Sequence, residues 1–203
     1  MKRGIIFAGG EFAVNDIVTD NSIIVCADSG YDSAILCGIT PNVVIGDMDS
    51  VKNHLPDGIE KIKLNCEKDD TDTQAAIDYL CDKGCSEILL LGALGGRIDH
   101  EIGNIMLTVY ALKKGVKLTI KDDKTEIFAV EKEAEFEGDE GDIVSIIPIE
   151  KNAEGVTLSG LKYTLENATM QVGKTLGISN EFLGGKAKIT VKKGIVLVIK
   201  VKR

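Results

Sequence analysis

The sequence contains no Trp and only 4% aromatic residues, although 44% of its 203 residues are hydrophobic. We therefore expect a core built mainly from aliphatic side chains. No apolar run approaches the length of a transmembrane helix, and the run at residues 4–7 is too short for a signal peptide. A net charge of −8 argues against general affinity for nucleic acid or an anionic membrane surface. A nucleotide substrate stays possible, because a metal ion and local basic residues can make the charge at a binding site positive although the whole chain is negative.

The chain has five cysteines, an odd number, at positions 26, 37, 66, 81 and 85. They lie in apolar or helical stretches, so we expect small buried hydrophobic residues in a reducing compartment and predict a cytoplasmic location. Cys81 and Cys85 are one helical turn apart and could bind a metal ion. No matching cysteine pair or histidine accompanies them, which disfavours a zinc site.

The hydrophobic pattern changes near residue 125. Before it, short β-branched runs alternate with helical patterns, which predicts an α/β domain at 1–124 with a mainly parallel sheet and helices on both faces. After it, short strands separated by Gly, Asn and Asp predict an all-β sandwich at 125–203. The first domain should have strands at 4–8, 23–27, 43–45, 59–64, 87–91 and 117–120, and helices near 30–38, 71–84 and 99–114. The second should have strands at 126–131, 142–149, 169–172, 186–192 and 195–201, and a hairpin turn at 192–194.

Acidic residues follow three of the predicted strands. Asp28 ends one strand, Gly46-Asp47-Met48-Asp49-Ser50 follows the next, and Lys68-Asp69-Asp70-Thr71-Asp72 follows a third. Open α/β sheets bind ligands beyond the carboxyl ends of their strands. Each acidic stretch alone is also typical of a solvated turn. Their repetition favours a site for a phosphorylated substrate with Mg²⁺, which prefers a few carboxylates together with substrate phosphates.

A glycine-rich segment, residues 91–100, lies between a predicted strand and a predicted helix. Its glycines at 92, 95 and 96 allow a sharp turn and close approach to a ligand, and the helix that follows points amide donors at that ligand. The spacing matches neither a Walker A loop nor the dinucleotide fingerprint, and a tight turn would also explain the glycines. Arg97, Asp99 and His100 beside them favour phosphate contact, since an Arg side chain can form paired hydrogen bonds to phosphate. We expect His100 to orient or contact substrate rather than act as a base, and His54 to be a loop residue.

Taken in order, these motifs resemble those of thiamine pyrophosphokinases. The resemblance rests on Ala27-Asp28-Ser29-Gly30, residues 46–50, 68–72 and 92–100, and, in the β region, on 160–163 (Gly-Leu-Lys-Tyr) and 177–181 (Gly-Ile-Ser-Asn-Glu). It spans nearly the whole chain. It implies an α/β nucleotide domain, a β-sandwich, and a homodimer whose thiamine sites involve both subunits. It also implies transfer of an intact pyrophosphoryl group from ATP to the hydroxyl of thiamine, with Mg²⁺, giving thiamine diphosphate and AMP.

The resemblance further implies roles for individual residues. The metal-binding acids would be Asp47, Asp49 and Asp72. The nucleotide-binding residues would be Asp28, Ser50, Lys68, Asp69, Gly95, Arg97, Asp99 and His100. We expect Asp28, Asp72, Lys68 and Arg97 to be catalytic, with either acid as a candidate to accept the hydroxyl proton. Tyr163 would stack on the thiamine pyrimidine, where some members have Trp, and Ser179 and Asn180 would also bind thiamine.

Two other functions stay open at this point. Clustered acids on a parallel sheet also suit a Mg²⁺- or Mn²⁺-dependent phosphohydrolase acting on a nucleotide-like substrate. Such sites often recruit histidines, and this chain has only two. A non-catalytic regulator that binds nucleotide or thiamine would leave the acidic clusters without a role.

Overall fold

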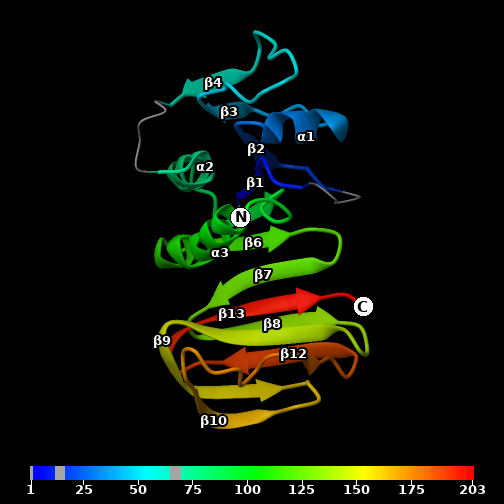
Figure 1. Ribbon diagram of the computed structural model, residues 1–203, viewed down its shortest axis with the longest axis vertical. Coiled ribbons are helices and arrows are strands. Elements are labelled where there is room, and N and C mark those ends of the chain that lie inside the picture. Colours follow the sequence, from blue (N-terminus) through cyan, green and yellow to red (C-terminus); the bar gives the residue numbers. More distant parts are fainter. Residues whose placement is uncertain (1, 12–16, 65–69) are drawn as a thin grey trace. The chain divides into compact units, whose positions relative to one another are not determined.

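The strands of the first unit, Met1–Asp123, form a parallel sheet. The computed structural model describes residues 2–11, 17–64 and 70–203 (Figure 1). The strands in the described part of this unit are β1 (Arg3–Phe7), β2 (Ser22–Ala27), β3 (Val43–Gly46), β4 (Glu60–Lys63), β5 (Glu87–Leu91) and β6 (Lys117–Lys121). Their order across the sheet is β4-β3-β2-β1-β5-β6. The predicted parallel sheet is therefore present.

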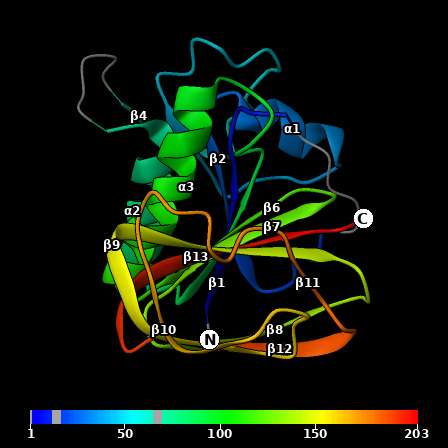
Figure 2. The same cartoon turned by 60° about the horizontal axis from the view of Figure 1, so that its bottom comes forward.

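Helices cover both faces of this sheet. They are α1 (Gly30–Leu36), α2 (Asp72–Asp82) and α3 (Ile98–Lys113). A Cβ atom placed on Gly4 of β1 would lie 2.5 Å from Leu80 of α2. The next residue, Ile5, belongs to a buried cluster with Tyr31 and Ala34 of α1. Since successive strand residues point to opposite faces, α1 and α2 lie on opposite sides of β1, as Figure 2 shows.

The second unit, Lys124–Arg203, is built around one long strand that belongs to two antiparallel sheets. This strand is β9 (Ile143–Ser159), and its first half pairs with β13 and β11. Its second half pairs with β10 and β12, and β7 and β8 extend the two sheets by pairing with β13 and β12. The remaining bounds are β7 (Thr125–Val130), β8 (Glu133–Gly138), β10 (Leu165–Met170), β11 (Asn180–Glu181), β12 (Gly185–Thr190) and β13 (Lys193–Val201).

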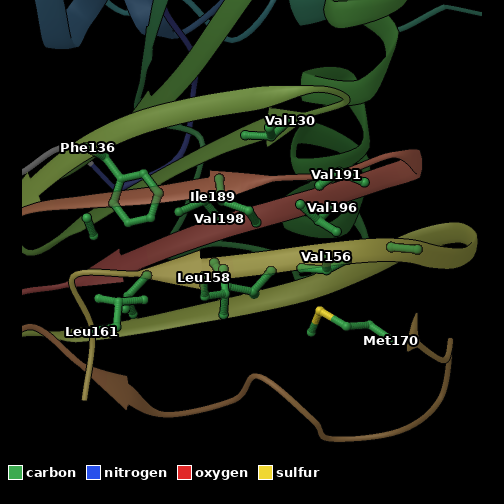
Figure 3. Close-up of a cluster of buried hydrophobic side chains, with 14 of the residues drawn as sticks. Val130, Phe136, Val156, Leu158, Leu161, Met170, Ile189, Val191, Val196 and Val198 are labelled. Atoms are coloured by element: carbon green, nitrogen blue, oxygen red, sulfur yellow. The ribbon is translucent and has the colours of Figure 1, made fainter. Parts of the chain in front are cut away.

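Apolar side chains from both sheets form the core of this unit (Figure 3). Phe136 of β8 makes edge-to-face contacts with Phe128 and Phe182, with ring centroids 5.9 Å apart in each pair. The other labelled members are aliphatic or Met: Val130, Val156, Leu158, Leu161, Met170, Ile189, Val191, Val196 and Val198. The mainly aliphatic core expected from the composition is therefore present, together with a small aromatic cluster.

Several strand predictions in the second unit were wrong. β8 was not predicted, because its Glu-rich sequence buries only Phe136. The strand predicted at 142–149 continues to Ser159, beyond an irregular step at Glu150, whose φ is +67°. The strand predicted at 169–172 is instead β10, which ends at Met170. The hairpin predicted at 192–194 is also wrong: β12 and β13 pair with opposite halves of β9, so the link at 191–192 crosses between sheets.

The four described cysteines are free. Cys26 and Cys85 are buried, as expected, and burial raises the pKa of Cys26 to about 12, which makes that thiol unreactive. Cys37 is exposed, contrary to the prediction, because it caps the C-terminus of the short helix α1. In the part of the chain that the structure describes, no helix is long and apolar enough to cross a membrane. The cytoplasmic location stays a prediction.

Candidate functional site

A cavity of about 600 Å³ opens in the first unit, where β1, β2 and β5 end and α2 and α3 begin. Five of the residues predicted from the sequence line it: Asp28, Ser50, Asp72, Arg97 and His100. β1 and β5 are adjacent although the chain runs from β1 to β2, so the strand order reverses between them. Open α/β sheets bind their ligands at such a reversal, and the cavity lies there.

One wall of the cavity is a segment that was not predicted from the sequence, residues 8–10. The amide of Gly10 donates to the carbonyl of Gly92 at 2.8 Å, and the amide of Glu11 donates to the carbonyl of Leu94 at 3.0 Å. A Cβ atom on Gly10 would lie 2.5 Å and 2.7 Å from these two carbonyl oxygens. The signal available was the pair Gly9-Gly10 directly after the first predicted strand.

Asp28 lines this cavity, and one of its carboxylate oxygens is buried. Its backbone has a φ of +48°, and its amide donates to the carbonyl of Ile45 at 2.9 Å. The Oδ2 atom accepts a hydrogen bond from the hydroxyl of Ser50. The Oδ1 atom is buried without a hydrogen-bond partner among the described residues. A buried carboxylate oxygen without a partner is costly, so a donor or a cation supplied by a ligand would stabilise it.

Arg97 caps α3 at the cavity wall and forms two hydrogen bonds with Asp99. Its Nη2 atom lies 2.6 Å from Oδ2, and its Nε atom lies 3.2 Å from Oδ1. This pairing raises the pKa of Arg97 and lowers the pKa of Asp99. The side chains are 74% and 61% exposed, and exposed ion pairs stabilise little. Arg97 can therefore exchange this partner for a phosphate at small cost.

The glycine-rich loop is held from α3 by two side chains that the sequence analysis also missed. Glu101 Oε1 accepts from the amide of Gly96 at 2.8 Å, and Asn104 Nδ2 donates to the carbonyl of Ala93 at 2.9 Å. Both side chains line the cavity. They are three residues apart, so they lie on one face of α3, and this spacing was the available signal. Gly95 and Asp99 belong to the same segment but do not line the cavity.

The loop after β3 carries Asp47 and Asp49, which do not line the cavity. Asp47 Oδ1 accepts from the amide of Asp49 at 3.0 Å, across Met48 with its φ of +67°. From α1, Asp32 holds the following segment by accepting hydrogen bonds from the amides of Lys52 and Asn53 at 3.0 Å and 2.9 Å.

The described acids do not form a closed metal cage. Among residues 2–11, 17–64 and 70–203, no three His, Cys, Asp or Glu side chains are grouped closely enough to hold a metal ion. Carboxylates are nevertheless the ligands that Mg²⁺ prefers, and Asp28 Oδ1 is unpartnered in the same region. The donor set therefore fits an open site, to which substrate phosphates would add ligands. Lys68 and Asp69 lie outside the described residues.

The three residues predicted to bind thiamine lie in the second unit. Asn180 is buried, and its side chain bonds both the amide and the carbonyl of Tyr163. The ring of Tyr163 is exposed. Ser179 is exposed, has a φ of +57°, and donates its amide to the hydroxyl of Ser145 at 3.0 Å. Asn180 contacts Tyr163 and follows Ser179 in the chain, so these three residues lie close together in the unit.

Comparison with known proteins identifies the relatives of this chain. Residues 14–120 match the catalytic domain of thiamin pyrophosphokinases, and residues 125–196 match their vitamin B1 binding domain. The chain belongs to the thiamine pyrophosphokinase family. It is 32% identical over 211 residues to thiamine pyrophosphokinase of Bacillus subtilis (strain 168), an alignment that covers 98% of this chain and 99% of the relative. The resemblance inferred from the motifs is thus confirmed.

Solved thiamine pyrophosphokinases share the fold over the whole chain. A crystal structure of the Bacillus subtilis protein aligns with a TM-score of 0.89 and 28% identity, covering 100% of this chain and 99% of that one. The protein from Geobacillus thermodenitrificans aligns with a TM-score of 0.84 and 26% identity, with 100% and 98% covered.

The backbone of the motif Ala27-Asp28-Ser29-Gly30 constrains its last two positions differently. The first of these is Ser29. Its φ of −60° and ψ of −11° are ordinary helical values, so a side chain causes no strain there. The adjacent Gly30 is different, because a Cβ atom there would lie 2.0 Å from the carbonyl oxygen of Phe7. The backbone requirement for glycine in this motif therefore falls on Gly30.

Proposed function

We propose that this chain is an enzyme that transfers the pyrophosphoryl group of ATP to the hydroxyl of thiamine, giving thiamine diphosphate and AMP. The observation that carries this proposal is the cavity lined by Asp28, Asp72 and Arg97 in the unit that matches the catalytic domain. The other unit matches the vitamin B1 binding domain. Residues 1–124 would then form the nucleotide- and metal-binding catalytic domain, and residues 125–203 the thiamine-binding and dimerisation domain.

The cavity suits the phosphates of ATP. Residues at the N-termini of α2 and α3 line it, and helix N-termini favour anions through their free amides and the helix dipole. Arg97 supplies a guanidinium that is released from Asp99 at small cost. We assign nucleotide contacts to Asp28, Ser50, Lys68, Asp69, Gly95, Arg97, Asp99 and His100.

Asp47, Asp49 and Asp72 would hold Mg²⁺. When bound, Mg²⁺ would neutralise charge on the phosphate oxygens and help to align the pyrophosphoryl group. Removing one of these carboxylates would weaken a site that has few protein ligands. The carboxylates of this region would also suit thiamine, which is a cation.

The residues around the cavity would then move a proton and stabilise charge. The thiamine oxygen forms a bond to the β-phosphorus, the bond from that phosphorus to the oxygen bridging the α-phosphate breaks, and AMP leaves with that oxygen. The hydroxyl proton passes to a carboxylate, either Asp28 or Asp72. Both residues line the cavity, which supports either assignment. Lys68 and Arg97 would stabilise the negative charge that grows on the leaving AMP.

In the second unit, Tyr163 would stack on the thiamine pyrimidine and Ser179 would hydrogen-bond it. We further propose a homodimer in which both subunits contribute to each thiamine site. Its support is a set of exposed apolar side chains on this unit: Val172, Leu176, Ile178 and Leu183. Light scattering after size-exclusion chromatography tests the dimer, and a monomer at micromolar concentration contradicts it.

Incubation with ATP, Mg²⁺ and thiamine tests the activity. We expect AMP and thiamine diphosphate to form in equal amounts, and AMP to form only when thiamine is present. Release of inorganic phosphate or pyrophosphate without an acceptor would indicate a phosphohydrolase instead. Binding of ATP or thiamine without turnover would indicate a regulator.

A further inference from the structure

The backbone around Tyr163 runs beside the segment that contains Asn180. Leu161 forms an antiparallel bridge with Phe182, and both side chains are buried. The amide of Lys162 then donates to the carbonyl of Glu181 at 2.9 Å. These contacts fix the chain up to the residue that precedes Tyr163.

At Tyr163 the side chain of Asn180 continues this pairing. The amide of Tyr163 donates to Asn180 Oδ1 at 2.9 Å, and Asn180 Nδ2 donates to the carbonyl of Tyr163 at 2.7 Å. The amide of Glu181 also donates to Asn180 Oδ1, at 2.9 Å. Asn180 is only 3% exposed, so these bonds are shielded from water.

These contacts use most of the hydrogen-bonding capacity of the Asn180 side chain. A side-chain amide oxygen has two lone pairs, and both are occupied by backbone amides. One of its two N–H donors bonds the carbonyl of Tyr163. By contrast, Tyr163 is 59% exposed, so burial does not fix its ring. The ammonium of Lys162 lies over the ring, 5.6 Å from its centroid. Apart from this contact, the direction of the ring depends on how firmly the backbone of Tyr163 is held.

We propose that Asn180 is a positioning residue of the thiamine site: it fixes the backbone of Tyr163, so that the ring is preformed as a stacking surface, and it does not contact thiamine itself. This inference rests on the proposed function, in which Tyr163 stacks on thiamine. Ordering a loop at the moment of binding reduces affinity, and a preformed loop avoids that cost. Asn180 thus acts through Tyr163.

The first test observes the ring directly. Because the chain has no Trp, Tyr163→Trp introduces a single Trp fluorophore at this position. Adding Asn180→Ala should lower the fluorescence anisotropy of that Trp and increase its quenching by acrylamide about twofold or more. Asn152→Ala is the matched control, since Asn152 also holds a turn of this unit, accepting from the amide of Val172 at 3.0 Å. This control should change neither quantity.

Unchanged anisotropy and quenching in folded Asn180→Ala protein would overturn the proposal. If Asn180→Ala does not fold, Asn180→Ser is used instead. Its hydroxyl can satisfy the adjacent Glu181 amide but is too short to reach both backbone groups of Tyr163, so the same changes are expected. These measurements need neither ATP nor thiamine, and they decide the inference even if the proposed activity is absent.

The second test is a double-mutant cycle measured by steady-state kinetics. Asn180→Ala should raise the KM for thiamine several-fold and leave the KM for ATP unchanged. In a Tyr163→Ala background the same substitution should have no further effect on the KM for thiamine, because the ring that it positions is gone. If the two effects multiply instead, Asn180 acts independently of Tyr163 and the proposal is wrong. Absence of thiamine-dependent AMP formation in the wild-type enzyme would count against the proposed function alone.

Discussion

Gly10→Ala should damage both the stability and the activity of the enzyme, because the loop around Gly10 has no room for a methyl group. The new Cβ atom would lie 2.5 Å from the carbonyl oxygen of Gly92 and 2.7 Å from that of Leu94. Ordinary contact begins near 3.4 Å, so the two loops must separate by roughly 0.7–0.9 Å. Both obstructing atoms are backbone carbonyls, which cannot turn aside as a flexible side chain can.

The same two carbonyls accept the hydrogen bonds that join the loops, at 2.8 Å and 3.0 Å. A separation of that size would lengthen these bonds beyond hydrogen-bonding distance. Losing them, at about 0.5–1.5 kcal/mol each, gives a destabilisation of about 1–3 kcal/mol. For a chain of this length that corresponds to a fall in Tm of roughly 2–12 °C. Because this wall lines the cavity, displacing it by nearly 1 Å should also lower kcat/KM by about 10²-fold.

The assay measures thiamine-dependent AMP formation together with thermal unfolding. Gly103→Ala is the control, since Gly103 lies on the exposed face of α3 and a Cβ atom there meets nothing within 4 Å. It should leave the rate unchanged and stabilise the helix by about 0.5–1 kcal/mol. A Gly10→Ala enzyme with wild-type Tm and a rate within twofold of wild type would refute this reasoning about the loop.

The other predictions concern the metal, the thiamine site and a loop anchor. Asp47→Asn, Asp49→Asn and Asp72→Asn should each lower kcat at least 10²-fold, about 2.7 kcal/mol, with an unchanged Tm; near-wild-type rates at saturating Mg²⁺ in any two would contradict the metal assignment. Calorimetry should show weak Mg²⁺ binding to the protein alone and tighter binding with ATP; equally tight binding without ATP would contradict an open site. Tyr163→Ala should raise the KM for thiamine several-fold, reflecting about 1 kcal/mol of lost stacking, and Phe should largely restore it; equal rises in the KM for ATP would indicate a structural role. Burial alone would raise the pKa of Asp32, but hydrogen bonds from Lys52 and Asn53 outweigh it and lower that pKa. Its charge therefore stabilises the fold above pH ~3.9. Urea unfolding measures how much less stable Asp32→Asn is than the wild type, and this difference in the free energy of unfolding should shrink as the pH falls below that value. A difference independent of pH would contradict this.

The sequence was sufficient to place much of the catalytic region. Buried apolar runs such as Val43–Ile45 identify strands covered on both faces, and such strands are parallel in α/β proteins. Parallel strands bring their carboxyl ends to one edge, which is why Asp28 and Arg97 could be assigned to one site although 69 positions separate them in the sequence. The cavity wall at residues 8–10 was missed, although the pair Gly9-Gly10 directly follows the first predicted strand. Its hydrogen bonds to the loop after β5 depend on β5 lying next to β1, and nothing local in the sequence indicates that neighbour.

The second unit was predicted less well because distant pairing decides its strands. In β8 the residues Glu133, Glu135 and Glu137 point to solvent, and only Phe136 is buried, so the usual alternation was too weak to detect. Local signals at 192–194 favoured a hairpin, yet pairing of β12 and β13 with β9 separates the two strands into different sheets. The buried role of Asn180 also escaped prediction, since a polar residue in a turn-like segment is most often exposed.

Three features of the catalytic region share one physical explanation. Among the described residues, Asp28 has a buried oxygen without a hydrogen-bond partner, Arg97 forms an exposed ion pair with Asp99, and the acids form no group able to hold a metal ion alone. The two charged side chains and the metal site can therefore each gain from charges that a ligand supplies. ATP carrying a divalent cation supplies both signs of charge at once: its phosphates can pair with Arg97 and the helix N-termini, and its cation can bind the carboxylates. The electrostatics of this region are therefore complementary to a metal–nucleotide complex rather than to either component alone.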